Sequence, residues 1–122
     1  GSRAASIRAL WTRGSCRQML IVLVTAPNEA EAEDLAVKIV EERLAACVQI
    51  LPRMSSVYVW EGTTQREHEW LLMIKTLDDR FEALSAFIRD KHSYDIPEIA
   101  AIDAERVSEP YLAWMKDVLD IS

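Results

Sequence analysis

The stretch KHSYDIPEI, residues 91–99, brings a histidine, a tyrosine and two acidic residues within seven positions of one another. A neutral imidazole at His92 suits copper or zinc, and Asp95 and Glu98 could add oxygen donors. A metal site needs three or four donors converging at about 2 Å, whereas a loop entering a strand points successive side chains in different directions. Three interpretations of His92 therefore stay open: a metal ligand, the lining of a small-molecule pocket, or the cap of a helix.

A second set of candidates lies on extended segments before this stretch. Tyr58 and Trp60 are two residues apart, so they share one face of a predicted strand, where they suit a subunit interface or the wall of a ligand cleft. Lys75 follows five apolar residues and, if half buried, needs a carboxylate partner, for which Glu98 on a neighbouring strand is the candidate. We therefore predict a cleft at a subunit boundary, lined by Trp60, Lys75, His92, Tyr94 and Glu98.

The other reactive residue types give no enzyme signature. Cys16 and Cys47 form no C-x-x-C pair, which argues against a disulfide framework and a structural zinc site and is typical of an intracellular protein. We interpret Cys47 as a small buried hydrophobe and His68 as a solvated surface residue. Residues 19–122 contain one glycine, so no glycine-rich loop can hold a nucleotide phosphate, and neither G-x-S-x-G nor H-E-x-x-H occurs. We expect a non-catalytic protein that requires no cofactor.

The elements that must position these residues follow from hydrophobic periodicity and turn signals. MLIVLVTAP (19–27) predicts a buried strand, and Asn28 predicts the cap of a helix, with Glu31 as the reciprocal partner of a capping box. The pattern then predicts a hairpin, with a long strand at 47–60 that is irregular at Pro52, a turn at Glu61-Gly62 and a second strand at 68–76. After the hairpin it predicts a helix from Asp78-Asp79 to near His92, a strand at 96–104 and a closing helix from Ser108 or Glu109.

The order β-α-β-β-α-β with a terminal helix predicts an α+β fold. Because β-α-β crossovers are right-handed, this order gives a ferredoxin-like split β-α-β sandwich, in which two helices cover one face of a four-stranded antiparallel sheet. The hairpin at 47–76 is longer than such a domain needs, since strands average about 5–6 residues. Its apolar and aromatic surplus would be an exposed edge in a monomer, so we expect it to pair with further copies of the chain.

Six motifs, in order from about residue 20 to the end, resemble the CutA family of divalent-cation tolerance proteins. They are TAPN (25–28), ERLAACVQILP (42–52), SVYVWEG (56–62), E-x-L-x-M-x-K-T (69–76), H-x-Y-x-x-P-E (92–98) and YLAW (111–114). The resemblance implies a ferredoxin-like homotrimer, related in architecture to the PII signalling proteins, whose long hairpins reach into neighbouring subunits. It also implies a non-enzymatic part in the response to divalent metal ions, with PII-like regulation by a small metabolite, or a scaffold for a protein partner, as the alternatives.

The resemblance also bears on metal binding, because copper(II) binding has been assigned to some members of this family. The implied ligands are a cysteine at the end of the first strand and two adjacent histidines that open the H-x-Y motif. These positions hold Val24, Lys91 and His92 in this chain, so His92 alone keeps a ligand side chain. We expect weak binding of copper(II) or another divalent cation involving His92, or of a small anionic ligand in the cleft.

Charge is distributed unevenly along the 122 residues. Residues 1–18 contain four arginines and no acid, and subtracting these from the 14 basic residues leaves 10 against 20 acidic residues, a net charge of about −10 for residues 19–122. Such a surface repels nucleic acid, and no apolar run reaches the roughly 20 residues that cross a membrane.

The basic segment sets the expected domain boundary. We expect one domain at 19–122, preceded at 1–18 by either a tag-derived tail that begins Gly-Ser or an arginine-rich organelle transit segment. The protein is accordingly expected in the cytoplasm, or in an organelle if residues 1–18 are native.

Overall fold

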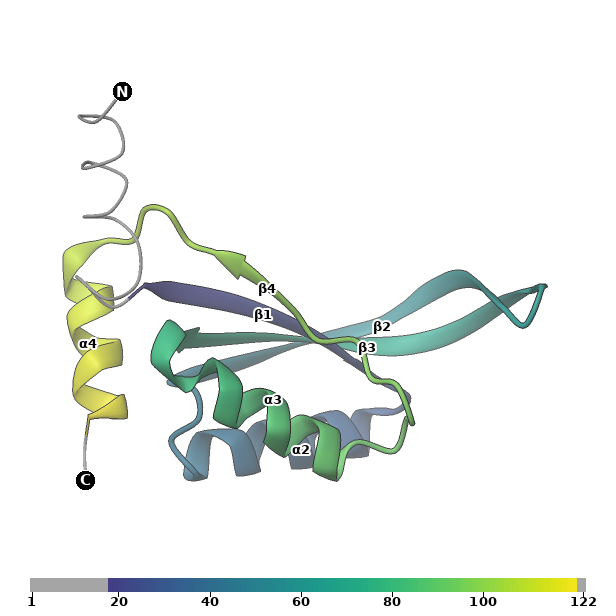
Figure 1. Ribbon diagram of the computed structural model, residues 1–122, viewed down its shortest axis with the longest axis horizontal. Coiled ribbons are helices and arrows are strands. Elements are labelled where there is room, and N and C mark those ends of the chain that lie inside the picture. The colour runs from purple at the N-terminus through teal and green to yellow at the C-terminus, as the bar shows by residue number, and fades with distance from the viewer. Residues whose placement is uncertain (1–17, 121–122) are drawn as a thin grey trace.

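The computed structural model describes residues 18–120, which form a four-stranded antiparallel sheet with two helices on one face and a third at one end (Figure 1). The elements in chain order are β1 (Met19–Ala26), α2 (Glu29–Glu41), β2 (Cys47–Trp60), β3 (Thr63–Leu77), a 3-10 turn (Asp78–Arg80), α3 (Phe81–Lys91), β4 (Ala100–Asp103) and α4 (Glu109–Leu119). Helices α2 and α3 lie side by side below the sheet, and α4 stands at the end opposite the hairpin tip.

The strand order is β2-β3-β1-β4, which places the first and third strands at the centre of the sheet. Strand β1 pairs with β3 along its whole length, from Met19 opposite Leu77 to Ala26 opposite Trp70. On its other side β1 pairs with the short β4. This arrangement confirms the predicted ferredoxin-like split β-α-β fold.

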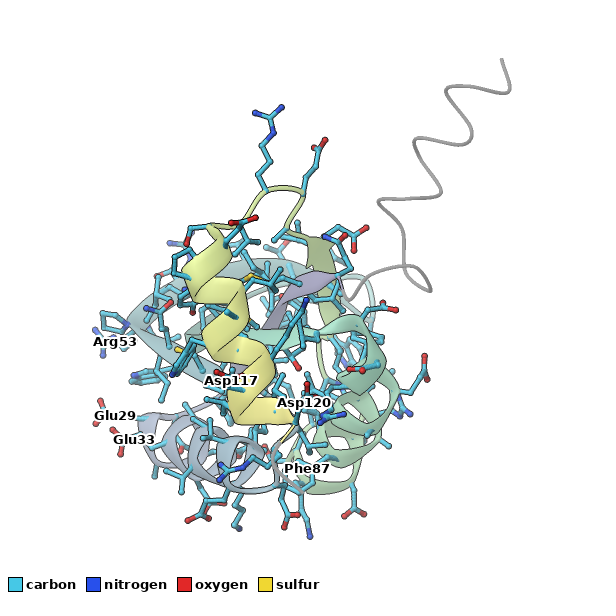
Figure 2. The ribbon with its side chains drawn as sticks, turned by 90° about the vertical axis from the view of Figure 1, so that its left-hand side faces the viewer. Glu29, Glu33, Arg53, Phe87, Asp117 and Asp120 are labelled. Carbon is cyan, nitrogen blue, oxygen red and sulfur yellow. The ribbon has the colours of Figure 1, made fainter. Side chains whose placement is uncertain are left out.

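Alternation along the strands and helical periodicity together build the core. Every second residue of β1 and β3 faces α2 and α3, and the largest fully buried side chains of this layer are Val22, Val24, Leu35, Ile39, Leu72, Ile74, Leu84 and Ile88. A second cluster, made of Met19, Ala46, Leu77, Met115 and Leu119, fixes α4 to the end of the sheet. Figure 2, which looks onto that end, shows Glu29 and Glu33 pointing outward from α2, as an amphipathic helix requires.

The start of α2 confirms one half of the predicted capping box. The side-chain oxygen of Asn28 accepts a hydrogen bond from the backbone N–H of Glu31 at 2.8 Å, which satisfies one of the unpaired donors of the first turn. The second half of the prediction is wrong, because the Glu31 carboxylate does not return to Asn28. It accepts hydrogen bonds from the backbone N–H and the hydroxyl of Ser93, a tertiary partner 62 residues away.

The β2-β3 hairpin has the predicted irregularity, but β3 begins at Thr63, five residues before the predicted start of that strand at His68. Strand β2 spans Cys47–Trp60 as expected, and its register with β3 shifts between Leu51 and Met54, around the proline that cannot donate to the ladder. The turn has positive φ at Glu61 (51°) and Gly62 (79°). Residues 54–60 and 63–69 pair only with each other, so they extend past the body of the protein as a two-stranded ribbon (Figure 1).

The segment after α3 differs from the prediction. A strand was expected at 96–104, but β4 covers only Ala100–Asp103. Pro97 has no N–H to donate to a ladder, and the preceding residues are held elsewhere, with the phenol of Tyr94 bonded to Glu69 of β3. Residues 93–99 are therefore an irregular segment, and this segment forms one wall of the site described below.

The described residues at the two ends of the fold are Gln18, before β1, and the closing helix α4. The predicted closing helix is confirmed, with Ser108 at its start and a proline in its first turn. Of the segment 1–18, residues 1–17 lie outside the described part, whereas Gln18 belongs to the fold, since its side chain donates to the carbonyl of Ala104 at 2.8 Å. No helix between residues 18 and 120 combines the length and the apolar character needed to span a membrane.

Candidate functional site

His92 lies where α3 ends, and its ring turns inward to β1. Its backbone N–H still donates to the carbonyl of Ile88, while its ring Nε2 lies 2.6 Å from the carbonyl oxygen of Thr25. Ring Nδ1 accepts the backbone N–H of Tyr94 at 3.0 Å. Because a carbonyl only accepts and a backbone N–H only donates, the ring is a neutral imidazole with its proton on Nε2. Both ring nitrogens are thus used within the fold, and His92 is the C-cap residue of α3 through its backbone N–H rather than through its ring.

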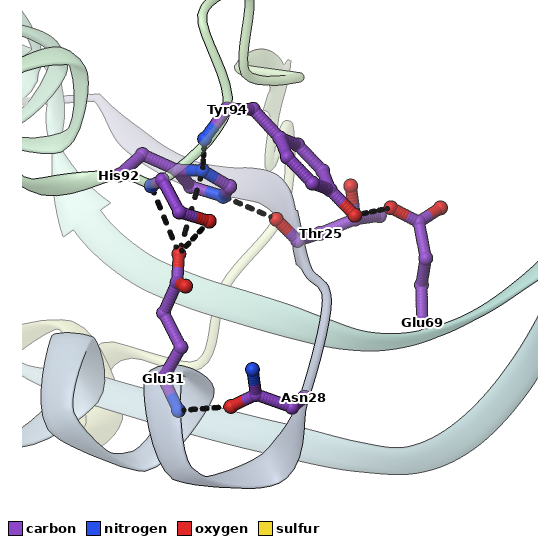
Figure 3. Close-up of polar contacts among 7 residues, drawn as sticks. Thr25, Asn28, Glu31, Glu69, His92 and Tyr94 are labelled. Atoms are coloured by element: carbon purple, nitrogen blue, oxygen red, sulfur yellow. Dashed lines mark hydrogen bonds and ion pairs between the residues drawn. The ribbon is translucent and has the colours of Figure 1, made fainter.

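Glu31 connects this histidine to α2. Its Oε2 accepts hydrogen bonds from the N–H and the hydroxyl of Ser93 and lies 3.5 Å from Nδ1 of His92 (Figure 3). The contacts join the end of β1, the first turn of α2 and the segment after α3. They fix the path of residues 93–99 before that segment reaches the hairpin.

Tyr94 carries the segment from His92 to β3. Its ring packs on the imidazole, with ring centroids 4.7 Å apart and planes inclined by 42°. Its hydroxyl donates to Oε2 of Glu69 at 2.9 Å. Burial raises the pKa of Tyr94 above its ordinary value, and the hydrogen bond to the Glu69 carboxylate raises it further. The phenol is therefore a neutral donor at neutral pH.

A pocket of about 610 Å³ lies between residues 93–98 and the hairpin and opens to solvent. It is lined by Thr25, Tyr58, Trp60, Gln65, Glu67, Glu69, Ser93, Tyr94, Asp95, Ile96 and Glu98. Three of the predicted cleft residues, Trp60, Tyr94 and Glu98, are therefore brought together, and His92 lies directly behind Tyr94. The wall carries four carboxylates and no lysine, arginine or histidine, so its field is negative.

Lys75 does not belong to this pocket, and its predicted pairing with Glu98 is wrong. Lys75 lies opposite Ile21 of β1, whereas Glu98 lies two residues before Ala100, the partner of Leu23, and lines the same pocket as Thr25. The two thus lie at different positions along β1, where Ile21 and Thr25 are four residues, roughly 13 Å, apart. No ion pair joins them in the described part of the chain. The prediction assumed that the strand of Lys75 and the strand near Glu98 are neighbours, whereas β1 lies between β3 and β4.

The positions of the family's implied copper ligands do not form a ligand set. Val24 is fully buried in the core beneath the sheet, and the ammonium of Lys91 lies 3.5 Å from the carboxylate of Asp90 at the surface. His92 uses both ring nitrogens, as described above. Over residues 18–120, no group of three or more histidine, cysteine, aspartate or glutamate side chains is arranged to hold a metal ion.

The two remaining candidates behave largely as structural residues. His68 is exposed on the hairpin, as predicted. Cys47 is half-buried rather than buried, and it lies beside Tyr111 of α4, whose pKa is raised chiefly by burial.

Sequence reasoning missed three of the acidic residues that shape the site. Glu67 and Glu69 could have been found, because they alternate with Gln65 along β3 and this alternation places all three on the face that carries Tyr58 and Trp60. Glu31 gave no such signal. Its position in the first turn of α2 indicates only a helix start, and its partner is distant in sequence.

Comparisons with known proteins extend what the motifs indicate. The family described as "CutA1 divalent ion tolerance protein" matches residues 20–118. "Protein CutA" of Homo sapiens is 41% identical over 97 residues, and "Protein CutA, chloroplastic" of Arabidopsis thaliana is 44% identical over 98 residues. Each match covers 80% of this chain and 54% of the relative, so the chain spans little more than half their length.

Solved structures agree with these sequence matches. The crystal structure of CutA1 from Oryza sativa superposes with a TM-score of 0.83 at 40% identity, covering 86% of this chain and 96% of that one. The family match over residues 20–118 and the superposition over nearly the whole described fold lead to one conclusion: the chain belongs to the CutA1 divalent ion tolerance protein family.

Proposed function

We propose that this chain is a non-enzymatic protein that takes part in tolerance of divalent cations by binding cations weakly. The observation that carries the proposal is the family match over residues 20–118. The four carboxylates of the pocket support it, because their negative field favours a cation over the small anion that the sequence left open. Weak binding follows from the lack of three converging ligands between residues 18 and 120.

His92 remains the proposed ligand for copper(II), at the cost of one hydrogen bond. Imidazole nitrogen is a preferred donor for copper(II), but Nδ1 must release the N–H of Tyr94 before it can bind the ion. This competition lowers the affinity. Copper(II) binding should therefore be measurable but weak.

Calorimetric titration with copper(II) and with manganese(II) tests both statements. We expect weak binding of both ions, with copper(II) binding reduced in His92→Ala and unchanged in the matched surface variant His68→Ala. Tight stoichiometric copper(II) binding that survives His92→Ala would overturn the assignment of the ligand. If neither ion binds, the proposed function itself is wrong.

We propose further that three copies assemble through the hairpin, as the family resemblance implies. The ribbon exposes 58% of Val57 and 67% of Val59, which lie on the face of β2 opposite Trp60, and every residue of the edge strand β4 is exposed in the single chain. Apolar strands with unpaired edges favour pairing with another chain.

Light scattering coupled to gel filtration measures this assembly. We expect three times the mass of one chain for the wild type and a smaller mass for Val57→Asp. Val37→Asp is the matched control, because Val37 is similarly exposed (55%) but lies on α2. A well-folded single chain in dilute buffer would refute the trimer.

A cytoplasmic or organellar location completes the proposal. The chloroplastic name of the Arabidopsis relative supports an organelle, as does the arginine-rich, acid-free composition of residues 1–18. Fluorescent fusions with and without residues 1–18 distinguish the two: organellar import that is lost with the segment supports the organelle, and a diffuse signal from both fusions supports the cytoplasm.

A further inference from the structure

The pocket between the hairpin and residues 93–98 combines aromatic rings with carboxylates. Tyr58, Trp60 and Tyr94 contribute the rings, and Ile96 adds an apolar surface. The same space is lined by Glu67, Glu69, Asp95 and Glu98. Its volume of about 610 Å³ lies within the roughly 300–1,000 Å³ typical of small-molecule sites, which is far more than one metal ion needs.

Glu69 places in the wall of this pocket a carboxylate whose hydrogen-bond partner is a neutral phenol. Its side chain lines the pocket although the residue is only 8% exposed. One carboxylate oxygen accepts the hydroxyl of Tyr94 (Figure 3). Among residues 18–120, no lysine, arginine or histidine forms an ion pair with this carboxylate. A phenol is a neutral donor, so the carboxylate that Glu69 contributes to the pocket wall has no countercharge among residues 18–120. A cationic group in the pocket would supply it.

The tyrosines provide neutral ring faces beside this charge. Burial and the bond to Glu69 raise the pKa of Tyr94, and a hydrogen bond to Glu67 raises the pKa of Tyr58. Both rings therefore stay protonated at neutral pH. The faces of such rings, and of the indole of Trp60, attract cations through their quadrupoles.

We propose that this pocket binds a small organic cation, with its ammonium group near Glu69 and its carbon substituents against Trp60. The inference rests on the proposed function in one respect, that the pocket is a site for cations, but it requires no metal. A divalent ion needs oxygen donors at about 2.0–2.6 Å, and no such set converges within residues 18–120. An ammonium group needs only an acidic space with aromatic walls.

Choline and 3,3-dimethyl-1-butanol form a matched pair of probes, because the second replaces the charged nitrogen of the first by carbon. Calorimetric titration of the full, metal-free chain at low ionic strength should show choline binding about tenfold more tightly than the neutral analogue. Trp60→Ala and Glu69→Gln should each weaken choline binding about tenfold. Trp114→Ala on α4 and Glu82→Gln on α3 remove the same groups outside the pocket and should change nothing.

Three results would overturn the inference: no saturable choline binding at millimolar concentration, equal affinity for both probes, or unchanged affinity in the pocket variants. Glu98→Gln is a second charge variant, for use if Glu69→Gln does not fold. A parallel manganese(II) titration separates this inference from the proposed function. Binding of manganese(II) without choline refutes the inference alone, and binding of choline without either metal ion refutes the metal function alone.

Discussion

The hydroxyl of Tyr94 donates to the carboxylate of Glu69 at 2.9 Å, across 25 residues of sequence. This bond ties the irregular segment between α3 and β4 to β3. It also closes one side of the acidic pocket. The stability of the fold and the shape of the site therefore depend on the same contact.

Replacing Tyr94 by phenylalanine should destabilise the protein by about 1–3 kcal/mol, because it leaves the buried Glu69 carboxylate without a donor. Urea denaturation measures the free energy of unfolding. The control is Tyr58→Phe, which removes a hydroxyl from a more exposed ring and should cost less. Equal losses in the two variants would contradict the role given to the Tyr94–Glu69 bond.

The raised pKa of Tyr94 predicts a loss of stability in alkali. Below about pH 10, the ordinary value for tyrosine, the phenol is protonated in both the folded and the unfolded chain, and its contribution is complete. Above that pH the unfolded chain loses the proton first, so the free energy of unfolding falls by up to about 1.4 kcal/mol per pH unit from this group. Thermal unfolding between pH 9 and 11 should show a shallower fall in Tyr94→Phe than in the wild type, and parallel curves would contradict this.

Truncating His92 should cost about 2–5 kcal/mol, since it leaves the carbonyl of Thr25 and the N–H of Tyr94 unpaired and opens a cavity. The melting temperature of His92→Ala reports this loss. The neighbouring Lys91→Ala changes an exposed side chain and should stay within about 0.5 kcal/mol of the wild type. A small effect at His92 would show that the ring is not a structural bridge.

In contrast to the changes above, replacing Ser85 should stabilise the protein. Its hydroxyl is buried on the inner face of α3 and has no hydrogen-bond partner among residues 18–120. Ser85→Ala should therefore raise the free energy of unfolding by about 1 kcal/mol, since it removes an unsatisfied polar group and introduces a better helix former. Ser55→Ala, at an exposed position of β2, serves as the comparison in the same denaturation experiment. A loss of stability at Ser85 would mean that the hydroxyl has a partner in solution.

Most of the fold could be predicted because its signals are local. Asn28 caps α2, the register shift lies around Pro52, and Gly62 takes the positive φ of the hairpin turn. Each of these effects depends on the residue itself and its near neighbours. The same holds for the alternating core residues of β1 and β3.

The site was predicted less well because it depends on contacts between distant segments. Trp60, Tyr94 and Glu98 line one pocket within a single chain, whereas the prediction placed their cleft at a subunit boundary, and Lys75 lies elsewhere on the sheet. The sequence around Glu98 is apolar enough for a strand, and only the tertiary bond from Tyr94 to β3, together with Pro97, keeps the segment irregular. Strand register, which no short pattern specifies, decides which side chains meet.

Amide hydrogen exchange in the two-stranded ribbon at the tip of the hairpin should report whether other copies of the chain are bound there. Hairpins of two strands alone are at best marginally stable in water. Deuterium should therefore replace the amide protons of residues 54–60 quickly in a solitary chain and slowly once neighbours shield them. The exchange rate at the tip should then rise as the protein is diluted, while the exchange rate of amides in the centre of β1 should not change with protein concentration.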